Sequence, residues 1–241
     1  MAPAAWAPKP AVEKLPLSIR KDVRDNFEAK KEDYESTIAG HLGFPVKIEF
    51  ETNAVAAYAD LTTPTLGYYF ATYVDGFIYG LTNFAQSYDD IGKEYFKNAV
   101  SEAKITLNVN ELGDKAPTID ADVKDGVFRI LFHHQKFGYN ASDLYSLLAT
   151  AIENAPHDGY SLLAKSSIEK EYNQKVDEAQ QQIGEVLNMP DVILDPNFEE
   201  NYAKLIKKKE KDWVRNYGDS SLKYFQYVAD SWYRSLSGKG H

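Results

Sequence analysis

The chain has 241 residues, a formal net charge of −9 and no cysteine. The acidic balance argues against general nucleic-acid binding, which needs a basic face, and the missing cysteine excludes disulfides, thiolate metal sites and a cysteine nucleophile. With 44% apolar and 13% aromatic residues, the chain can bury a substantial core, in one large domain or two small ones.

Residues 1–16 are rich in proline and alanine and are predicted to form a flexible arm, on which Trp6 could dock against the body or a partner. The segment has no basic stretch followed by an apolar core, so it does not resemble a secretory signal. No apolar run approaches the ~20 residues that span a bilayer. We therefore expect no membrane span and a cytoplasmic protein, although a presequence already removed would leave the same pattern.

Residues 17–43 are predicted to form the N-terminal helix. Ser18 is a suitable N-cap, Gly43 ends the helix and Pro45 follows it. Acidic and basic residues are interspersed on the remaining surface of this helix, which indicates a solvated, ion-paired face rather than a ligand site.

Residues 44–155 are predicted to form an α+β core. A strand is expected at 46–50, followed by an unusually aromatic helix at 67–88 and a second helical piece at 90–104. On the helix, one continuous stripe recurs every three or four residues: Phe70, Tyr73, Phe77, Leu81, Phe84 and Tyr88. Such a stripe is either the central core element or the wall of an aromatic pocket.

Alternating apolar residues then predict strands at 105–109, 118–123 and 127–133. Asp125-Gly126 lies between the last two, and this dipeptide is typical of a hairpin turn. A helix is expected at 140–154. The predicted fold is α+β, with a small, mainly antiparallel sheet covered by the aromatic-rich helix and with a helical C-terminal layer.

Residues 156–241 are predicted to be helical and to pack on the core. In the 161–187 helix, apolar residues from Ile168 to Val186 recur at nearly heptad spacing, which is typical of a helix that pairs with another helix. We expect a protein partner or a second copy of the chain on this surface. Asp195-Pro196 predicts the start of a further helix.

Catalytic and metal-binding motifs give no positive signal, so we assign neither catalytic nor metal-ligating residues. Neither phosphate-binding glycine pattern occurs, and there is no G-x-S-x-G nucleophile elbow. His133 and His134 are adjacent near the end of a predicted strand, where neighbouring side chains face opposite ways and cannot easily bind one ion. We interpret them as ordinary rim histidines.

Two functional hypotheses remain. The first is a non-enzymatic binding or assembly protein that uses helical surfaces for protein association. The second is a small-molecule binder or enzyme whose aromatic pocket lies between helix 67–88 and the sheet, lined by Tyr73, Asp75, Tyr79 and His133. The ligand or cofactor of such a pocket is not identified by the sequence. The missing catalytic motifs favour the first hypothesis.

Overall fold

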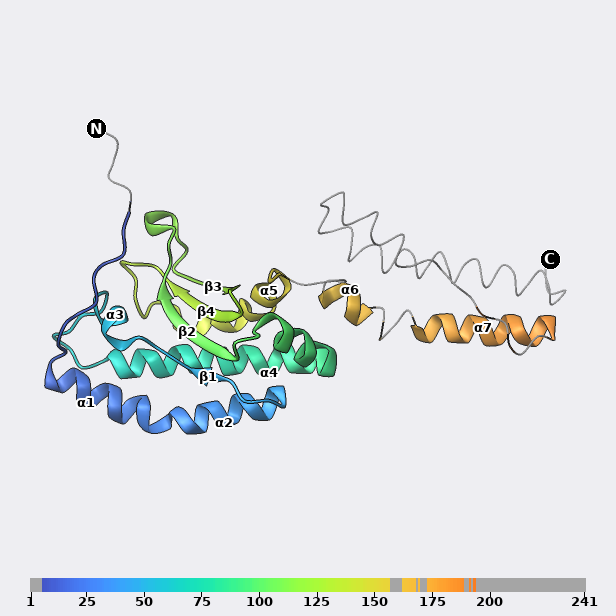
Figure 1. The fold of residues 1–241 in the computed structure, drawn as a ribbon, viewed down its shortest axis with the longest axis horizontal. Helices are drawn as coiled ribbons and strands as arrows, with labels where there is room; N and C mark the ends of the chain where they lie inside the picture. Colours follow the sequence, from blue (N-terminus) through green and yellow to red (C-terminus); the bar gives the residue numbers. More distant parts are fainter. Residues whose placement is uncertain are drawn as a thin grey trace, which may run out of the picture. The chain divides into compact units, whose positions relative to one another are not determined.

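The computed structural model describes residues 6–156, 162–167, 169, 173–188, 191 and 193. The chain divides into two compact units, Met1–Asp158 and Gly159–His241, and each is described by itself. The first unit contains helices and a small four-stranded sheet, so the predicted α+β class is confirmed (Figure 1).

The elements of the first unit follow one another in a regular order. They are α1 (Leu17–Asn26), η1 (Glu28–Lys30), α2 (Lys31–Leu42), β1 (Lys47–Ile48), α3 (Thr52–Ala56), α4 (Leu66–Ala99), β2 (Lys104–Val109), η2 (Gly113–Lys115), β3 (Ile119–Lys124), β4 (Val127–Phe132), η3 (Ala141–Ser146) and α5 (Leu148–Glu153). The described helices of the second unit are α6 (Leu162–Ser167) and α7 (Asn173–Leu187).

The sheet is mixed, and the prediction of a mainly antiparallel sheet is wrong. Its strand order is β1-β2-β4-β3; β1 pairs with β2 and β2 with β4 in parallel, and only β3 pairs with β4 in antiparallel fashion. The crossover through α3 and α4 returns the chain in its original direction, which makes the β1–β2 pair parallel. The β3–β4 hairpin then docks through its second strand, so β3 becomes an edge.

The hairpin turn itself is as predicted. Asp125 and Gly126 both have positive φ, 52° and 74°, as a two-residue type I′ turn requires. Its formation fixes the register in which Val123 lies opposite Phe128.

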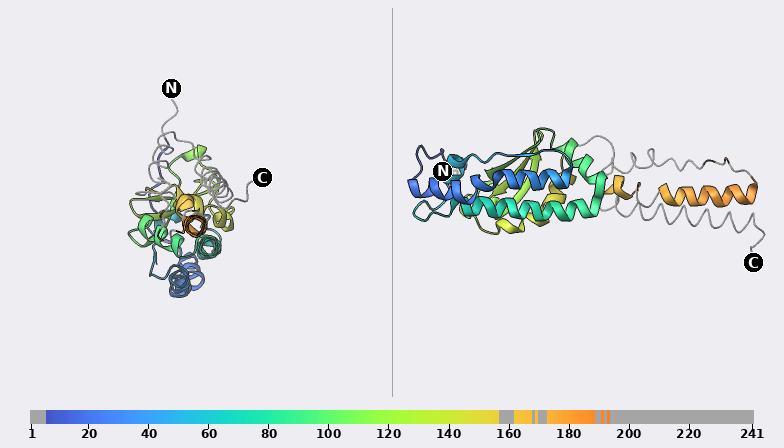
Figure 2. Two further views of the ribbon diagram at one scale, coloured as in Figure 1. Left: turned by 90° about the vertical axis from the view of Figure 1, so that its right-hand side faces the viewer. Right: turned by 90° about the horizontal axis from the view of Figure 1, so that it is seen from below.

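Two predicted helices have interruptions or ends that local residues explain. The 17–43 helix is divided at Phe27 into α1 and α2, and it ends at Gly43, whose φ of 79° is left-handed. In α4, Asp89 has a non-helical backbone with φ 50°, so the predicted division between 67–88 and 90–104 coincides with a kink. Figure 2 shows α1 and α2 running beside α4.

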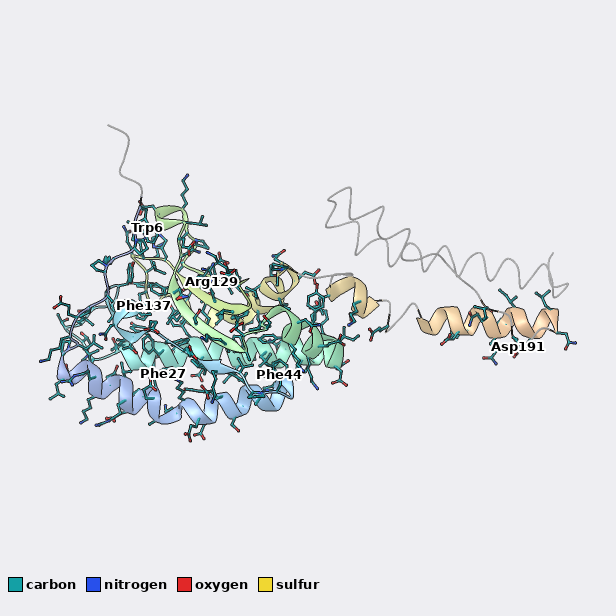
Figure 3. The ribbon with its side chains drawn as sticks, viewed as in Figure 1. Trp6, Phe27, Phe44, Arg129, Phe137 and Asp191 are labelled. Atoms are coloured by element: carbon teal, nitrogen blue, oxygen red, sulfur yellow. The ribbon has the colours of Figure 1, made fainter. Side chains whose placement is uncertain are left out.

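The inward face of α4 is packed ring against ring. Phe70 contacts Phe27 at a centroid distance of 5.2 Å, and Phe77 contacts Phe128 of β4 at 5.1 Å. Phe96, beyond the kink, lies 6.4 Å from Phe77 and stacks with Phe128 at 6.3 Å. These aromatic rings are buried and form the centre of the core (Figure 3 labels Phe27 among them).

Glycines let other backbones approach α4 very closely. A Cβ at Gly76 would lie 2.8 Å from the carbonyl oxygen of Ala141, and one at Gly80 would lie 2.9 Å from the Cα of Tyr145. At the start of the helix, a Cβ at Gly67 would lie 2.7 Å from the Cα of Val23 on α1. Side chains larger than hydrogen therefore do not fit at these three crossings.

A buried carboxylate joins α1 to the N-terminus of α4. Oδ2 of Asp22 accepts a hydrogen bond from the backbone N–H of Gly67 at 2.6 Å, and Oδ1 accepts one from Nδ2 of Asn26 at 2.7 Å. The first N–H groups of a helix have no partner within the helix and carry a partial positive charge. Asp22 thus caps α4 from a residue 45 positions away.

In the second unit, the predicted 161–187 helix corresponds to α6 and α7 with a gap in the described residues between them. Ile168, the first residue of the predicted seam, and the helix predicted from Asp195 lie outside the described residues. Among the helices that the structure describes, we find none with the length and apolar character to cross a membrane.

We expect Gly80→Ala to destabilise the first unit by about 1–3 kcal/mol, because the added methyl overlaps the backbone of η3. Gly40→Ala on α2 is the matched control, since nothing lies within 4 Å of its would-be Cβ. That control should stabilise by roughly 0.5–1 kcal/mol through helix propensity. Urea unfolding measures both; equal effects at the two positions would contradict the close approach.

We expect Asp22→Ala to cost about 1–3 kcal/mol of unfolding free energy, because the Gly67 N–H loses its only cap in a buried setting. Asp25→Ala, three residues along α1, removes an exposed ion pair with Arg24 and should change stability little. If the two variants unfold alike, Asp22 does not cap α4.

Candidate functional site

Tyr73 points into the core. Its side chain is 0% exposed, and its hydroxyl accepts a hydrogen bond from the backbone N–H of Gly138 at 3.1 Å. Burial raises the pKa of this phenol well above its ordinary value. Its ring lies 5.9 Å from Phe137, so Tyr73 is packed among core aromatics rather than presented to solvent.

His133 lies just past the end of β4 and is also buried, with 6% exposure. Its Nδ1 accepts a hydrogen bond from the N–H of Gln135 at 3.1 Å, so in the neutral ring the proton is on Nε2. The chain turns here, with Lys136 N–H donating to the His133 carbonyl, and the rings of His133 and His134 stack at 4.6 Å. The opposed orientation expected of neighbours on a strand is therefore replaced by stacking.

Asp75 and Tyr79 lie on the outward side of α4, one helical turn apart. Tyr34, on α2, lies near enough to Asp75 for the two groups to shift each other's pKa. Tyr79 is 58% exposed, and its ring meets that of Tyr145, on η3, edge to face at 5.3 Å. We call Tyr34, Tyr68, Asp75, Tyr79 and Tyr145 the outer tyrosine face.

The structure therefore divides the four predicted site residues. It brings Asp75 and Tyr79 together on the outer tyrosine face, whereas Tyr73 and His133 are buried elsewhere. In comparisons with protein-family models, curated proteins and solved structures, nothing matches this chain.

Electrostatics set Asp75 apart from ordinary surface carboxylates. Burial raises the pKa of its carboxyl, and the nearby Lys30 and Tyr34 lower it in part. Burial, followed by the nearby Asp75, raises the pKa of Tyr34. A partly desolvated carboxylate between tyrosines can accept hydrogen bonds from an incoming group, and the rings offer flat amphipathic contact area.

A cluster of charged side chains on the sheet is already paired. Arg129 of β4 donates to both carboxylate oxygens of Asp122 at 2.7 and 2.6 Å, and to Glu111 at 3.2 Å (Figure 3 labels Arg129). Such a bidentate pair holds the hairpin strands in register. Within the described residues, no three His, Asp or Glu side chains gather closely enough to hold a metal ion.

Sequence reasoning missed Tyr34 and Tyr145. Tyr68, Asp75 and Tyr79 recur at helical spacing, so a second, outward stripe is visible in the sequence beside the aromatic one. Tyr34 and Tyr145 come from other elements, and only the packing of α2 and η3 against α4 brings them to the same face.

The raised pKa of Asp75 predicts a pH dependence with a definite sign. Because the folded-state pKa exceeds the unfolded one, the contribution to stability is present below the unfolded pKa and is lost as pH rises through the folded pKa. We expect Asp75→Asn to be at least as stable as the parent protein at about pH 7, and to lose any advantage at about pH 3, in urea unfolding.

Asp60→Asn is the control of opposite sign. The hydroxyl and N–H of Thr62 donate to Asp60 and lower its pKa, so its contribution is present above the unfolded pKa and lost as pH falls through the folded one. Asp60→Asn should thus be the less stable variant near neutral pH. Large destabilisation by Asp75→Asn near neutral pH would show that Asp75 is a structural carboxylate instead.

Proposed function

We propose that the protein is a non-enzymatic binding or assembly protein that associates with other proteins through helical surfaces. The observation that carries this proposal is the division of α4 into two aromatic faces. Phe70, Tyr73 and Phe77 are at most 1% exposed and packed against other core residues, whereas Tyr68 and Tyr79 are 60% and 58% exposed. Tyrosine is enriched at protein interfaces relative to the rest of the protein surface, and these two tyrosines are not part of the core.

The sheet edges support association through helices rather than through strands. Glu35 on α2 accepts a hydrogen bond from the Ile48 N–H of β1 at 3.0 Å. At the other edge, the Asp120 carboxylate accepts one from the Ala121 N–H of β3 at 2.9 Å. Since these two edge N–H groups are already bonded to carboxylates, they are not available to pair with a strand of another chain.

The 161–187 segment is the second surface of this proposal. Along α7, Val176, Ala179, Ile183 and Val186 continue the near-heptad spacing. Ile183 is buried within the chain at 5% exposure, whereas Leu187 at the end of α7 is exposed. An association surface on this segment would therefore include the end of α7.

The alternative, an aromatic pocket between helix 67–88 and the sheet, has less support. The rings that would line it are packed against one another, from Phe77 to Phe128 and from Tyr73 to Phe137. If the native mass of the protein exceeds the mass of the chain by a few hundred daltons, roughly the size of a small-molecule ligand, this alternative is restored.

Deletion of residues 161–187 should remove the association made through that segment while leaving the first unit folded, because a helical seam is removed and no core residue of that unit is touched. Native mass spectrometry of protein purified from its own source measures the association, and near-UV circular dichroism monitors the aromatic core. Tyr79→Ser with Tyr145→Ser is the companion variant for the outer tyrosine face.

If the deletion protein associates normally, the 161–187 surface is excluded. If the double tyrosine variant also associates normally, the proposal of helical association fails as a whole. Glu35 and Asp120 remain intact in both variants, so a gain of edge pairing does not confuse the result.

A further inference from the structure

From Trp6 onward, the N-terminal segment contacts the rest of the first unit. The backbone N–H of Lys9 donates to the Tyr58 hydroxyl at 2.7 Å, and its Nζ donates to the Ala57 carbonyl at 3.2 Å while lying 5.2 Å from the Tyr58 ring centroid. The N–H of Val12 donates to the Asn53 carbonyl at 3.0 Å. An extended strap thus crosses the region of α3.

Trp6 packs on the backbone of η2 at Gly113, a surface that we call the Gly113 shelf. Gly113 in η2 has φ 59°, and a Cβ there would lie 2.6 Å from Cγ of the Trp6 ring. Trp6 also lies 5.8 Å from the ring of His134, which is paired through Nε2 with Asp114 at 3.2 Å. Figure 3 shows Trp6 beside the η2 loop.

The strap is held at a few points only. Residues 7–11 are exposed, Trp6 and Val12 are half-buried, and Leu15 is buried at the junction with α1. Segments with few buried apolar contacts open at low free-energy cost. Glu13 and Lys14 are exposed between the strap and Leu15, where a hinge changes no buried contact.

We infer that the strap is exchangeable, and that residues 6–12 of a second copy of this chain occupy the same surface. Exchange of an identical segment makes the same contacts in both arrangements, so it is a low-cost route to pairing. Every copy carries the Trp-Ala-Pro-Lys segment that fits the Gly113 shelf and the Tyr58 hydroxyl. This inference does not depend on the outer tyrosine face or on the 161–187 segment.

Intramolecular docking competes with exchange, because a short linker holds the strap at an effective concentration of roughly millimolar. Exchange therefore becomes visible when chains are concentrated or held together in an assembly.

Chemical cross-linking tests the exchange directly, since the chain has no cysteine. One copy carries Lys9→Cys, the other carries Ala57→Cys, and the two are mixed at about 1 mM with a short bismaleimide. We expect a linked pair of different copies, competed away by a free peptide of residues 5–13. Trp6→Ala in the Lys9→Cys copy should reduce linking about tenfold, the usual weight of a tryptophan anchor.

Two controls make each result decisive. The first replaces Ala57→Cys by Ser36→Cys, an exposed position on α2, and measures linking by random collision. The second places Lys9→Cys and Ala57→Cys in one chain, where they should link within it. Linking between copies at the level of the Ser36→Cys control, with efficient linking inside the double variant, would overturn the exchange; failure of the double variant to link would overturn the strap contact itself.

Discussion

The close approach of α1 and η3 to α4, at three glycines, is the constraint on which the first unit depends. Gly67 admits α1, and Gly76 and Gly80 admit η3, each at a distance that a single methyl would prevent. These crossings place α1 and η3 against α4, and Asp22 adds a hydrogen bond to the first of them. With these neighbours fixed, the large rings of the same helix reach Phe27 on one side and Phe128 on the other. The three glycines thus set the distance between α4 and its neighbours, and the aromatic side chains fill the space between them.

Because α1 and η3 are held at these short distances from α4, one stripe of the helix surface remains exposed. The helix is long enough to be flanked by α1, α2, η3 and α5, yet its outward stripe meets α2 and η3 only at their margins, through Tyr34 and Tyr145. A helix that served the core alone would carry charged or small residues there. The exposed Tyr68, Asp75 and Tyr79 instead give this side of the helix an amphipathic character, which is the reason to seek association on it.

Local patterns predicted much of this fold, and tertiary choices account for the rest. The period-two runs of β2, β3 and β4, the Asp125-Gly126 turn and the helix end at Gly43 depend on neighbouring residues, and the sequence reveals them. The parallel β2–β4 pair does not follow from either strand, because both orders of docking the hairpin bury the same faces. The break at Phe27 and the Tyr34–Asp75 contact likewise depend on segments far away in the chain. By contrast, helical spacing alone separates the predicted site residues Tyr73 and Tyr79, which are six positions apart and lie on different sides of one helix: one meets Phe137 and the other meets solvent.

Asp22, which lies on α1 against the N-terminus of α4, and Asp75, which lies on α4 itself, differ in how the fold affects their charge. Asp22 lies at the N-terminus of the helix, where the free N–H of Gly67 and the helix dipole both favour a negative charge. Asp75 lies in the middle of the helix, where burial opposes its charge and raises its pKa. Asp75 thus carries a charge that its surroundings oppose, and it lies between exposed tyrosines. If another molecule binds at the outer tyrosine face, as proposed above, a hydrogen-bond donor or positive charge placed near Asp75 would add to the compensation that Lys30 and Tyr34 provide in part.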